Sequence, residues 1–145
     1  MPTTFTRIPR PVVTAALLLT GALSSGAMSR AAGQDQGVEV KPARAQQLPN
    51  VPGKTLTAVV VRYAPGAKSS AHEHAGSVFV YVLSGAIRSE NSATGPAKIY
   101  QAGETFFEPP GSKHLVSENA SATEPASLLA VFVADDGAQL TRFDK

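Results

Sequence analysis

The chain has 145 residues, with 13 Lys and Arg against 11 Asp and Glu, and it contains no cysteine. This length allows one domain with a modest core. Without cysteine the protein has no disulfide, no thiolate nucleophile and no thiolate metal ligand, so any metal must be held by nitrogen and oxygen atoms.

The first 31 residues have the pattern of a secretory signal peptide. Arg7 and Arg10 form a basic start, the apolar run VVTAALLL follows at 12–19, and small residues precede an expected cleavage point near Ala31. The apolar run is short and is followed by Thr and Gly, so an uncleaved membrane anchor is the weaker interpretation. We therefore expect a secreted or periplasmic protein.

The chain is divided into a signal peptide (1–31), a linker (32–37) and a single folded domain (38–145). Three of the 13 basic residues lie in the signal peptide, which leaves 10 against 11 acidic residues in the mature protein. No basic cluster remains that could follow a phosphate backbone, so we expect no nucleic acid partner. We also expect no stable membrane insertion after cleavage.

The folded domain is predicted to be all-β. Short runs rich in Val, Thr, Phe and Tyr alternate with Gly, Pro, Ser and Asn, which is typical of strands and turns. The predicted strands are 38–45, 55–63, 77–83, 86–89, 98–100, 105–108, 114–117 and 127–133. This number and spacing of strands indicate a sandwich or a small barrel. The C-terminal segment DDGAQLTRFDK is compatible with a short helical turn.

Two of the three histidines, His72 and His74, stand one residue apart. In a strand, residues i and i+2 project to the same face, so both imidazoles would enter one space while Glu73 points away to solvent or to a Lys partner. The third, His114, follows a Pro-Pro-Gly turn at the start of another predicted strand and is the third candidate ligand. Histidines at the surface or in the core, without a metal, are the alternative interpretation.

The segment APGAKSSAHEHAGSVFVYVLSG, residues 64–85, resembles the first motif of the cupins. That motif runs Gly, five residues, His-x-His, three or four residues, Glu, six residues and Gly. The matching positions here are Gly66, His72, His74 and Gly85. Val78 stands in the place of the Glu.

The second cupin motif runs Gly, five residues, Pro-x-Gly, two residues, His, three residues and Asn. Its matching positions here are Gly103, Pro109, Gly111 and His114. Glu118 stands where Asn is usual, and Asn119 follows one step later. The resemblance extends over most of residues 38–134. It implies a single-domain, RmlC-like cupin fold, which is a conical antiparallel β-barrel, also called a double-stranded β-helix or jelly roll, and frequently a homodimer.

The resemblance further implies that His72, His74 and His114 bind a divalent metal inside the barrel. Because Val78 removes the acidic ligand, three neutral imidazoles would leave the ion its double positive charge and favour an anionic or chelating oxygen ligand. The ligand set is similar to that of the thiol dioxygenases and the β-diketone-cleaving dioxygenase, so Fe(II) is favoured, with Mn, Ni, Zn or Cu as alternatives. Metal loss is expected as the pH falls through about 6.5.

Glu108, just before the turn that leads to His114, is the candidate catalytic residue. It could be an outer base, a substitute ligand or a rim charge, and the two adjacent prolines leave its facing open, with the rim favoured. Arg88 is expected in solvent more than in the cavity. The aromatic residues expected to be core are Phe79, Tyr81, Phe106 and Phe107.

These observations lead to three function hypotheses. The first is an exported Fe(II)-dependent, dioxygenase-type enzyme that acts on a small chelating, oxygen-containing substrate. The alternative is a non-catalytic, metal-containing cupin that binds or stores a small molecule. A structural zinc site is weaker, because structural zinc normally has four protein ligands.

Overall fold

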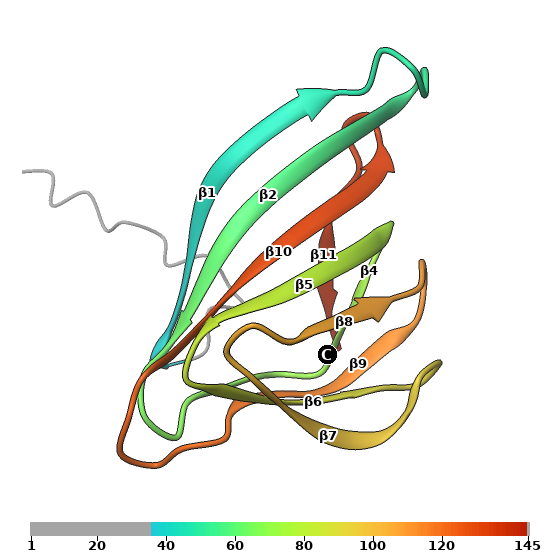
Figure 1. Ribbon diagram of the computed structural model, residues 1–145. Coiled ribbons are helices and arrows are strands. Elements are labelled where there is room, and N and C mark those ends of the chain that lie inside the picture. Colours follow the sequence, from blue (N-terminus) through green and yellow to red (C-terminus); the bar gives the residue numbers. More distant parts are fainter. Residues whose placement is uncertain (1–35, 145) are drawn as a thin grey trace, which may run out of the picture.

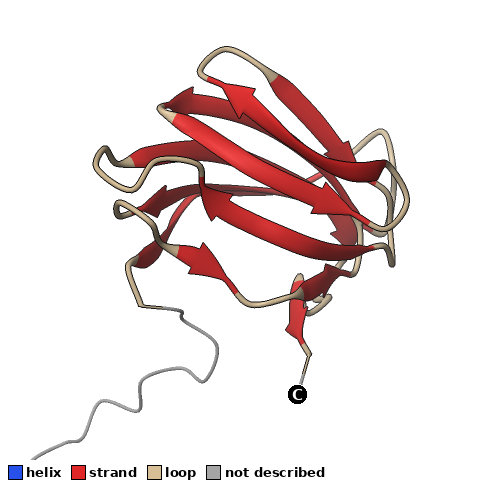
Figure 2. Ribbon diagram, turned by 90° about the horizontal axis from the view of Figure 1, so that it is seen from below, coloured by secondary structure: helices blue, strands red, loops and turns tan. Residues whose placement is uncertain are grey.

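The computed structural model describes residues 36–144, and these form strands, turns and loops (Figures 1 and 2). The strands are β1 (Val38–Gln47), β2 (Lys54–Tyr63), β3 (Lys68–Ser69), β4 (His72–His74), β5 (Ser77–Ser84), β6 (Ala86–Asn91), β7 (Gly95–Gln101), β8 (Thr105–Glu108), β9 (Lys113–Asn119), β10 (Ala126–Asp135) and β11 (Thr141–Phe143). No helix long and apolar enough to cross a membrane occurs in this part of the chain. The expected signal peptide lies outside the described residues, and its cleavage stays a prediction.

Two antiparallel sheets face each other (Figure 1). Sheet A has the order β1-β2-β10-β5-β8, and sheet B has the order β11-β4-β9-β6-β7, with β3 also paired to β9. Strands that are far apart in the sequence are neighbours in both sheets, as when β10 lies between β2 and β5. This arrangement agrees with the expected antiparallel barrel.

The core lies between the sheets and follows the period of two that strands impose. Every second residue of β10 is buried, from Ala126 to Ala134, and Val78, Val80 and Val82 of β5 are buried in the same way. All eight predicted strands are present, most of them longer than expected. The expected helical turn at the C-terminus is wrong, because Thr141–Phe143 forms a strand that pairs with β4.

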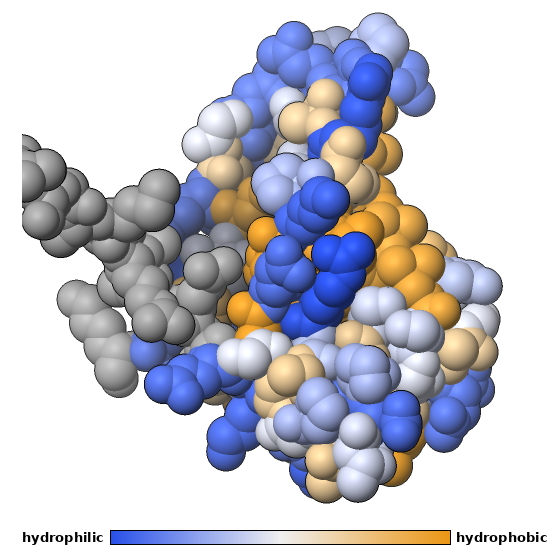
Figure 3. Space-filling view, turned by 90° about the vertical axis from the view of Figure 1, so that its left-hand side faces the viewer, coloured by the Kyte–Doolittle hydropathy of each residue, from blue (hydrophilic) through white to orange (hydrophobic). Residues whose placement is uncertain are grey.

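Sheet A also has an exposed outer face. Phe79, Tyr81 and Phe107 are 46%, 39% and 50% exposed, so their assignment to the core is wrong, and only Phe106 of the four aromatic residues lines the interior. Strand alternation explains this result, because the inward positions are taken by Val78 and Val80 on β5 and by Phe106 and Glu108 on β8. On the side of the molecule seen in Figure 3, hydrophilic side chains lie beside an exposed hydrophobic area.

A glycine turn joins the second motif to the first. Gly111, with φ 69°, adopts the left-handed conformation that glycine reaches without steric cost. Its N–H donates to the carbonyl oxygen of His74 at 3.0 Å. The Pro-Pro-Gly turn is thereby attached to the strand that carries two of the histidines.

The departure at the end of the second motif is accommodated by a bulge in β9. Asn91 pairs with His114 while Glu90 pairs with Val116, so one extra residue is inserted in β9 between them. The bulge reverses the alternation, and Asn119 faces inward while Glu118 stays near the surface with Arg88 at 2.7 Å. This confirms the solvent position expected for Arg88.

Asn119 has a structural role at the end of β9. Its amide group donates to the carbonyl oxygens of Ala64 and Glu124 at 3.1 and 2.7 Å, and its oxygen accepts from the Ser121 N–H at 2.9 Å. The loop after β2 and the loop between β9 and β10 are thus joined at one buried side chain, which is 6% exposed.

Asn119→Ala should therefore lower the free energy of unfolding by about 2–3 kcal/mol, because it leaves buried backbone groups without their partner. Glu118→Ala, at the motif position itself, should cost less than about 1 kcal/mol, because it removes only a surface ion pair. Urea denaturation of both variants measures the difference. Equal losses would mean that Asn119 does not hold these loops.

Candidate metal centre

The three histidines meet inside the barrel. His72 and His74 project from β4, and His114 of β9 is the direct pairing partner of His72. All three are buried, at 7%, 7% and 3% exposure. One ring nitrogen from each lies within 4.8 Å of the others, which is close enough for a single metal ion to join them. The prediction that these histidines come together is confirmed.

Backbone carbonyls orient two of the imidazoles. The Nδ1–H of His72 donates to the Ser70 carbonyl oxygen at 2.7 Å, and the Nδ1–H of His74 donates to that of Leu140 at 3.1 Å. Because a carbonyl oxygen only accepts, each Nδ1 carries the proton and each Nε2 keeps its lone pair. Both Nε2 atoms are therefore ready to bind a metal, which is the usual arrangement around metal-binding histidines.

Strand β11 pairs with β4 along the edge of β4 that does not pair with β9. Thr141 is the pairing partner of His74, and its Oγ1 lies 3.2 Å from His74 Nδ1. The Phe143 ring packs against the His72 ring with centroids 5.4 Å apart. On the outer face, Arg142 forms an ion pair with Glu73 at 3.0 Å, so Glu73 points away from the site as expected, although its partner is an Arg.

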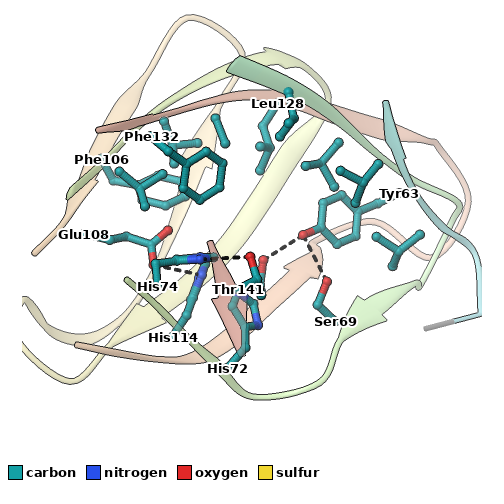
Figure 4. A pocket seen from close by; sticks show the side chains of 18 of the residues that line it. Tyr63, Ser69, His72, His74, Phe106, Glu108, His114, Leu128, Phe132 and Thr141 are labelled. Atoms are coloured by element: carbon teal, nitrogen blue, oxygen red, sulfur yellow. Dashed lines mark hydrogen bonds and ion pairs between the residues drawn. The ribbon is translucent and has the colours of Figure 1, made fainter. Parts of the chain in front are cut away.

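Glu108 lies inside the cavity beside the histidines (Figure 4). It is 2% exposed, so the favoured rim position is wrong. Its Oε2 lies 3.1 Å from His114 Nδ1 and 3.9 Å from His74 Nε2. The cause is the sheet register: Glu108 of β8 is the direct partner of Val78 of β5, so the carboxylate enters the barrel one strand away from the motif position.

Polar partners hold Glu108 and His114 in place. The Asn91 amide donates to Glu108 Oε2 at 3.3 Å and to Ser112 Oγ at 2.9 Å. His114 Nδ1 faces the carboxylate, and its Nε2 lies 2.9 Å from Ser89 Oγ. The sequence contained no motif that would have singled out Ser89, Asn91 or Thr141, because their roles depend on strand pairing.

The electrostatics favour a cation. Burial lowers the pKa of His72 to about 4, and burial likewise lowers the pKa of His74, so both imidazoles are neutral near neutral pH. Burial alone would raise the pKa of Glu108, but the hydrogen bond with His114 and the surrounding histidines outweigh it and the net pKa is lowered. The expected purely neutral ligand set is therefore corrected: an ionised carboxylate lies beside the three nitrogens. Such a set of donors fits a divalent metal ion.

The histidines and Glu108 open onto a cavity of about 300 Å³ between the two sheets. Its wall is mainly apolar: Val59, Val61, Val78, Val80, Phe106, Leu128, Ala130 and Phe132. Figure 4 shows the polar groups gathered on one side of this space and the apolar side chains on the other. The volume is at the lower end of the range for small-molecule pockets, roughly 300–1,000 Å³.

A family model described as a cupin domain matches residues 59–132, which is about half of the chain and includes all three histidines. A comparison with curated protein sequences finds no match.

Solved structures share the fold at low sequence identity. The DMSP lyase DddQ from Ruegeria pomeroyi is 18% identical with a TM-score of 0.58, covering 73% of this chain and 51% of the lyase. A recombinant oxalate oxidase in complex with glycolate is 22% identical with a TM-score of 0.58, covering 74% and 55%. A cupin-like protein from Thermotoga maritima is 21% identical with a TM-score of 0.55, covering 74% and 75%. The chain spans about half the length of the lyase and the oxidase.

Thr141→Val should weaken metal binding about tenfold, because it removes one of the two acceptors that orient the His74 ring while keeping the shape of the side chain. Thr141→Ser, which retains the hydroxyl, is the matched control and should bind as the wild type does. Competition with a chromophoric chelator measures the affinity. If the Val and Ser variants bind equally, the hydroxyl does not position His74.

The metal-free protein should lose stability as the pH falls. The folded pKa of His72 is about 4 against an ordinary 6.5, so its contribution is complete above pH 6.5 and is lost as the pH falls toward 4. Between pH 7 and pH 5 the loss from His72 should be about 2 kcal/mol. Urea denaturation of chelator-treated protein tests this, with His72→Asn flattening the dependence. An unchanged slope in that variant would contradict the assignment.

Proposed function

The chain belongs to the cupin family, and from this membership we propose that it is a metal-dependent, dioxygenase-type enzyme acting on a small chelating, oxygen-containing substrate. Fe(II) is the favoured metal, with Mn, Ni, Zn and Cu as alternatives, because imidazole nitrogen binds all of them. Two of the solved structures that share the fold are named as enzymes, a lyase and an oxidase, which supports an enzymatic function.

One observation carries the proposal: three buried imidazole nitrogens within 4.8 Å of one another lie beside a mainly apolar cavity. Three protein nitrogens leave coordination positions for substrate, whereas a structural site is normally closed by four protein ligands. A bound Fe(II) would supply the Lewis acid and the redox centre for O2. In a dioxygenase reaction both oxygen atoms enter the substrate, so no external reductant is needed.

The residues of this chain have distinct tasks in the proposed reaction. The histidines hold the metal, and the cavity admits a substrate whose oxygen atoms face it. Glu108 is proposed as the catalytic residue, because an ionised carboxylate 3.9 Å from His74 Nε2 can accept a proton from a substrate hydroxyl as that substrate chelates. Phe132 packs edge-on against the His74 ring with centroids 5.1 Å apart, and in the proposed reaction it would limit the access of water to the site.

The alternative function is a non-catalytic, metal-containing cupin that binds or stores a small molecule. The observation that favours it is Val78, which is 1% exposed and makes the usual position of the acidic ligand apolar. Tight binding of a carboxylate or a sugar without product formation would select this function.

We further propose that the protein is secreted or periplasmic, because residues 1–31 have the pattern of a signal peptide. We propose neither a nucleic acid partner nor stable insertion in a membrane. A homodimer is proposed on family resemblance, and the exposed pair Phe79 and Phe107 on adjacent strands supplies an apolar outer face for it.

The proposed function is tested by metal content and oxygen uptake. Protein purified from its own compartment should contain a divalent metal by elemental analysis, and the Fe(II)-loaded protein should consume O2 with a diketone, a flavonol or a thiol. Glu108→Gln should retain the metal, because the three imidazoles are unchanged, and should lose about a hundredfold in turnover, because the amide cannot accept a proton. Glu39→Gln, an exposed carboxylate on β1, is the matched control.

The possible results separate the two functions. Metal-loaded protein that binds these compounds unchanged and takes up no O2 supports the binding function. Loss of the metal itself in Glu108→Gln would make Glu108 a ligand and contradict its role as proton acceptor.

A further inference from the structure

A second polar group lines the same cavity, apart from the histidines and Glu108. Tyr63 of β2 reaches across from sheet A, and its Oη lies 2.7 Å from Ser117 Oγ and 3.4 Å from Ser69 Oγ, both in sheet B. Tyr63 and Ser117 are each 3% exposed, and all three residues line the cavity. Figure 4 shows the Tyr63 hydroxyl pointing toward Ser69 and away from the apolar wall. We name Tyr63, Ser69 and Ser117 the hydroxyl cluster.

If the hydroxyl cluster served only to fill space, burying its three hydroxyl groups would cost free energy that apolar side chains would not. Apolar side chains of similar size, Phe and Ala, would fill the same space without removing three hydroxyl groups from water. In the hydroxyl cluster either partner of each contact can donate, because a hydroxyl rotates and both donates and accepts. The cluster can therefore present a donor or an acceptor to a polar atom in the cavity.

Strand register sets the distance between the hydroxyl cluster and the histidines. Ser69 pairs with Ser117, and His72 pairs with His114, so on each side a serine stands three residues from a histidine. Three residues of strand span roughly 10 Å. The bulge in β9 turns Ser117 inward on the same side as His114. The cavity thus has two polar positions separated by roughly the length of a small aromatic molecule, with apolar walls between them.

The charges lining the cavity restrict the chemistry of what binds. Among the described residues that line the cavity, Glu108 carries the one carboxylate, and none is a Lys or an Arg. A carboxylate or phosphate at the hydroxyl cluster would therefore lack a counter-charge, whereas a neutral hydroxyl or carbonyl group would be matched.

We propose that the hydroxyl cluster is a second substrate subsite, which binds a neutral hydroxyl or carbonyl at one end of a compact, mainly apolar molecule whose other end chelates the metal. This inference rests on the proposed function for its metal end. It assigns substrate specificity to Tyr63 and Ser117, which are binding residues remote from the reacting end.

A matched pair of probes tests the subsite. Benzohydroxamic acid and 4-hydroxybenzohydroxamic acid chelate a metal identically and differ by one hydroxyl at the far end of the ring. Binding to the Zn-substituted protein, which has no redox chemistry, is measured by isothermal titration calorimetry. The wild type should prefer the 4-hydroxy probe about fivefold, the contribution of one net hydrogen bond.

Variants assign that preference to the hydroxyl cluster. Tyr63→Phe and Ser117→Ala should each remove the preference for the 4-hydroxy probe over benzohydroxamic acid. Tyr81→Phe makes the same chemical change on the outer face of β5, where the residue is 39% exposed, and should retain the preference.

The results distinguish the two proposals. Equal binding of both probes by the wild type, or a preference that survives in Tyr63→Phe and Ser117→Ala, overturns the subsite and leaves the metal site standing. If neither hydroxamate binds the Zn-substituted protein, the chelation on which both proposals rest is overturned.

Discussion

The structure depends on pairing every polar group that it buries inside an apolar barrel. Three imidazoles, a carboxylate and several hydroxyls would each cost free energy in that environment without a hydrogen-bond partner. Among the described residues, no buried side-chain nitrogen or oxygen lacks a partner. The backbone carbonyls of Ser70 and Leu140 receive the Nδ1 protons of His72 and His74. Because Nδ1 of His72 and of His74 is paired, Nε2 of each ring faces the cavity. The same two hydrogen bonds therefore stabilise the fold and leave a nitrogen of each ring able to bind a metal.

Both departures from the cupin motifs are offset by a neighbouring residue. Val78 stands on β5 where the first motif has a Glu, and Glu108 supplies a carboxylate from the paired position on β8. Glu118 stands at the motif position of the asparagine, and a bulge in β9 turns the next residue, Asn119, inward to bind the carbonyl oxygens of Ala64 and Glu124. Two changes that look like losses in the sequence are therefore displacements by one strand and by one residue.

The displaced carboxylate alters the chemistry of the site. An ionised Glu108 beside the neutral imidazoles of His72 and His74 places a negative charge next to their nitrogens, which would attract a divalent cation and partly neutralise it. The carboxylate is also hydrogen-bonded to His114 and Asn91, so it is held in position beside the metal ligands. The proposed enzyme thus differs from a three-histidine site without a carboxylate, although the motif spacing suggests such a site.

The sequence by itself determined the all-β fold and the eight main strands, because strand periodicity is a local pattern, and its resemblance to the two cupin motifs implied that the three histidines converge. It left open the facing of Glu108, which only the register between β5 and β8 decided. It could not reveal the support that Thr141 and Leu140 give to His74, since these residues are 67 and 66 positions away along the chain. The inward turn of Ser117 likewise depends on a bulge that exists only between paired strands. Side-chain direction in a barrel is a property of strand pairing, and pairing between distant segments is decided by the tertiary structure.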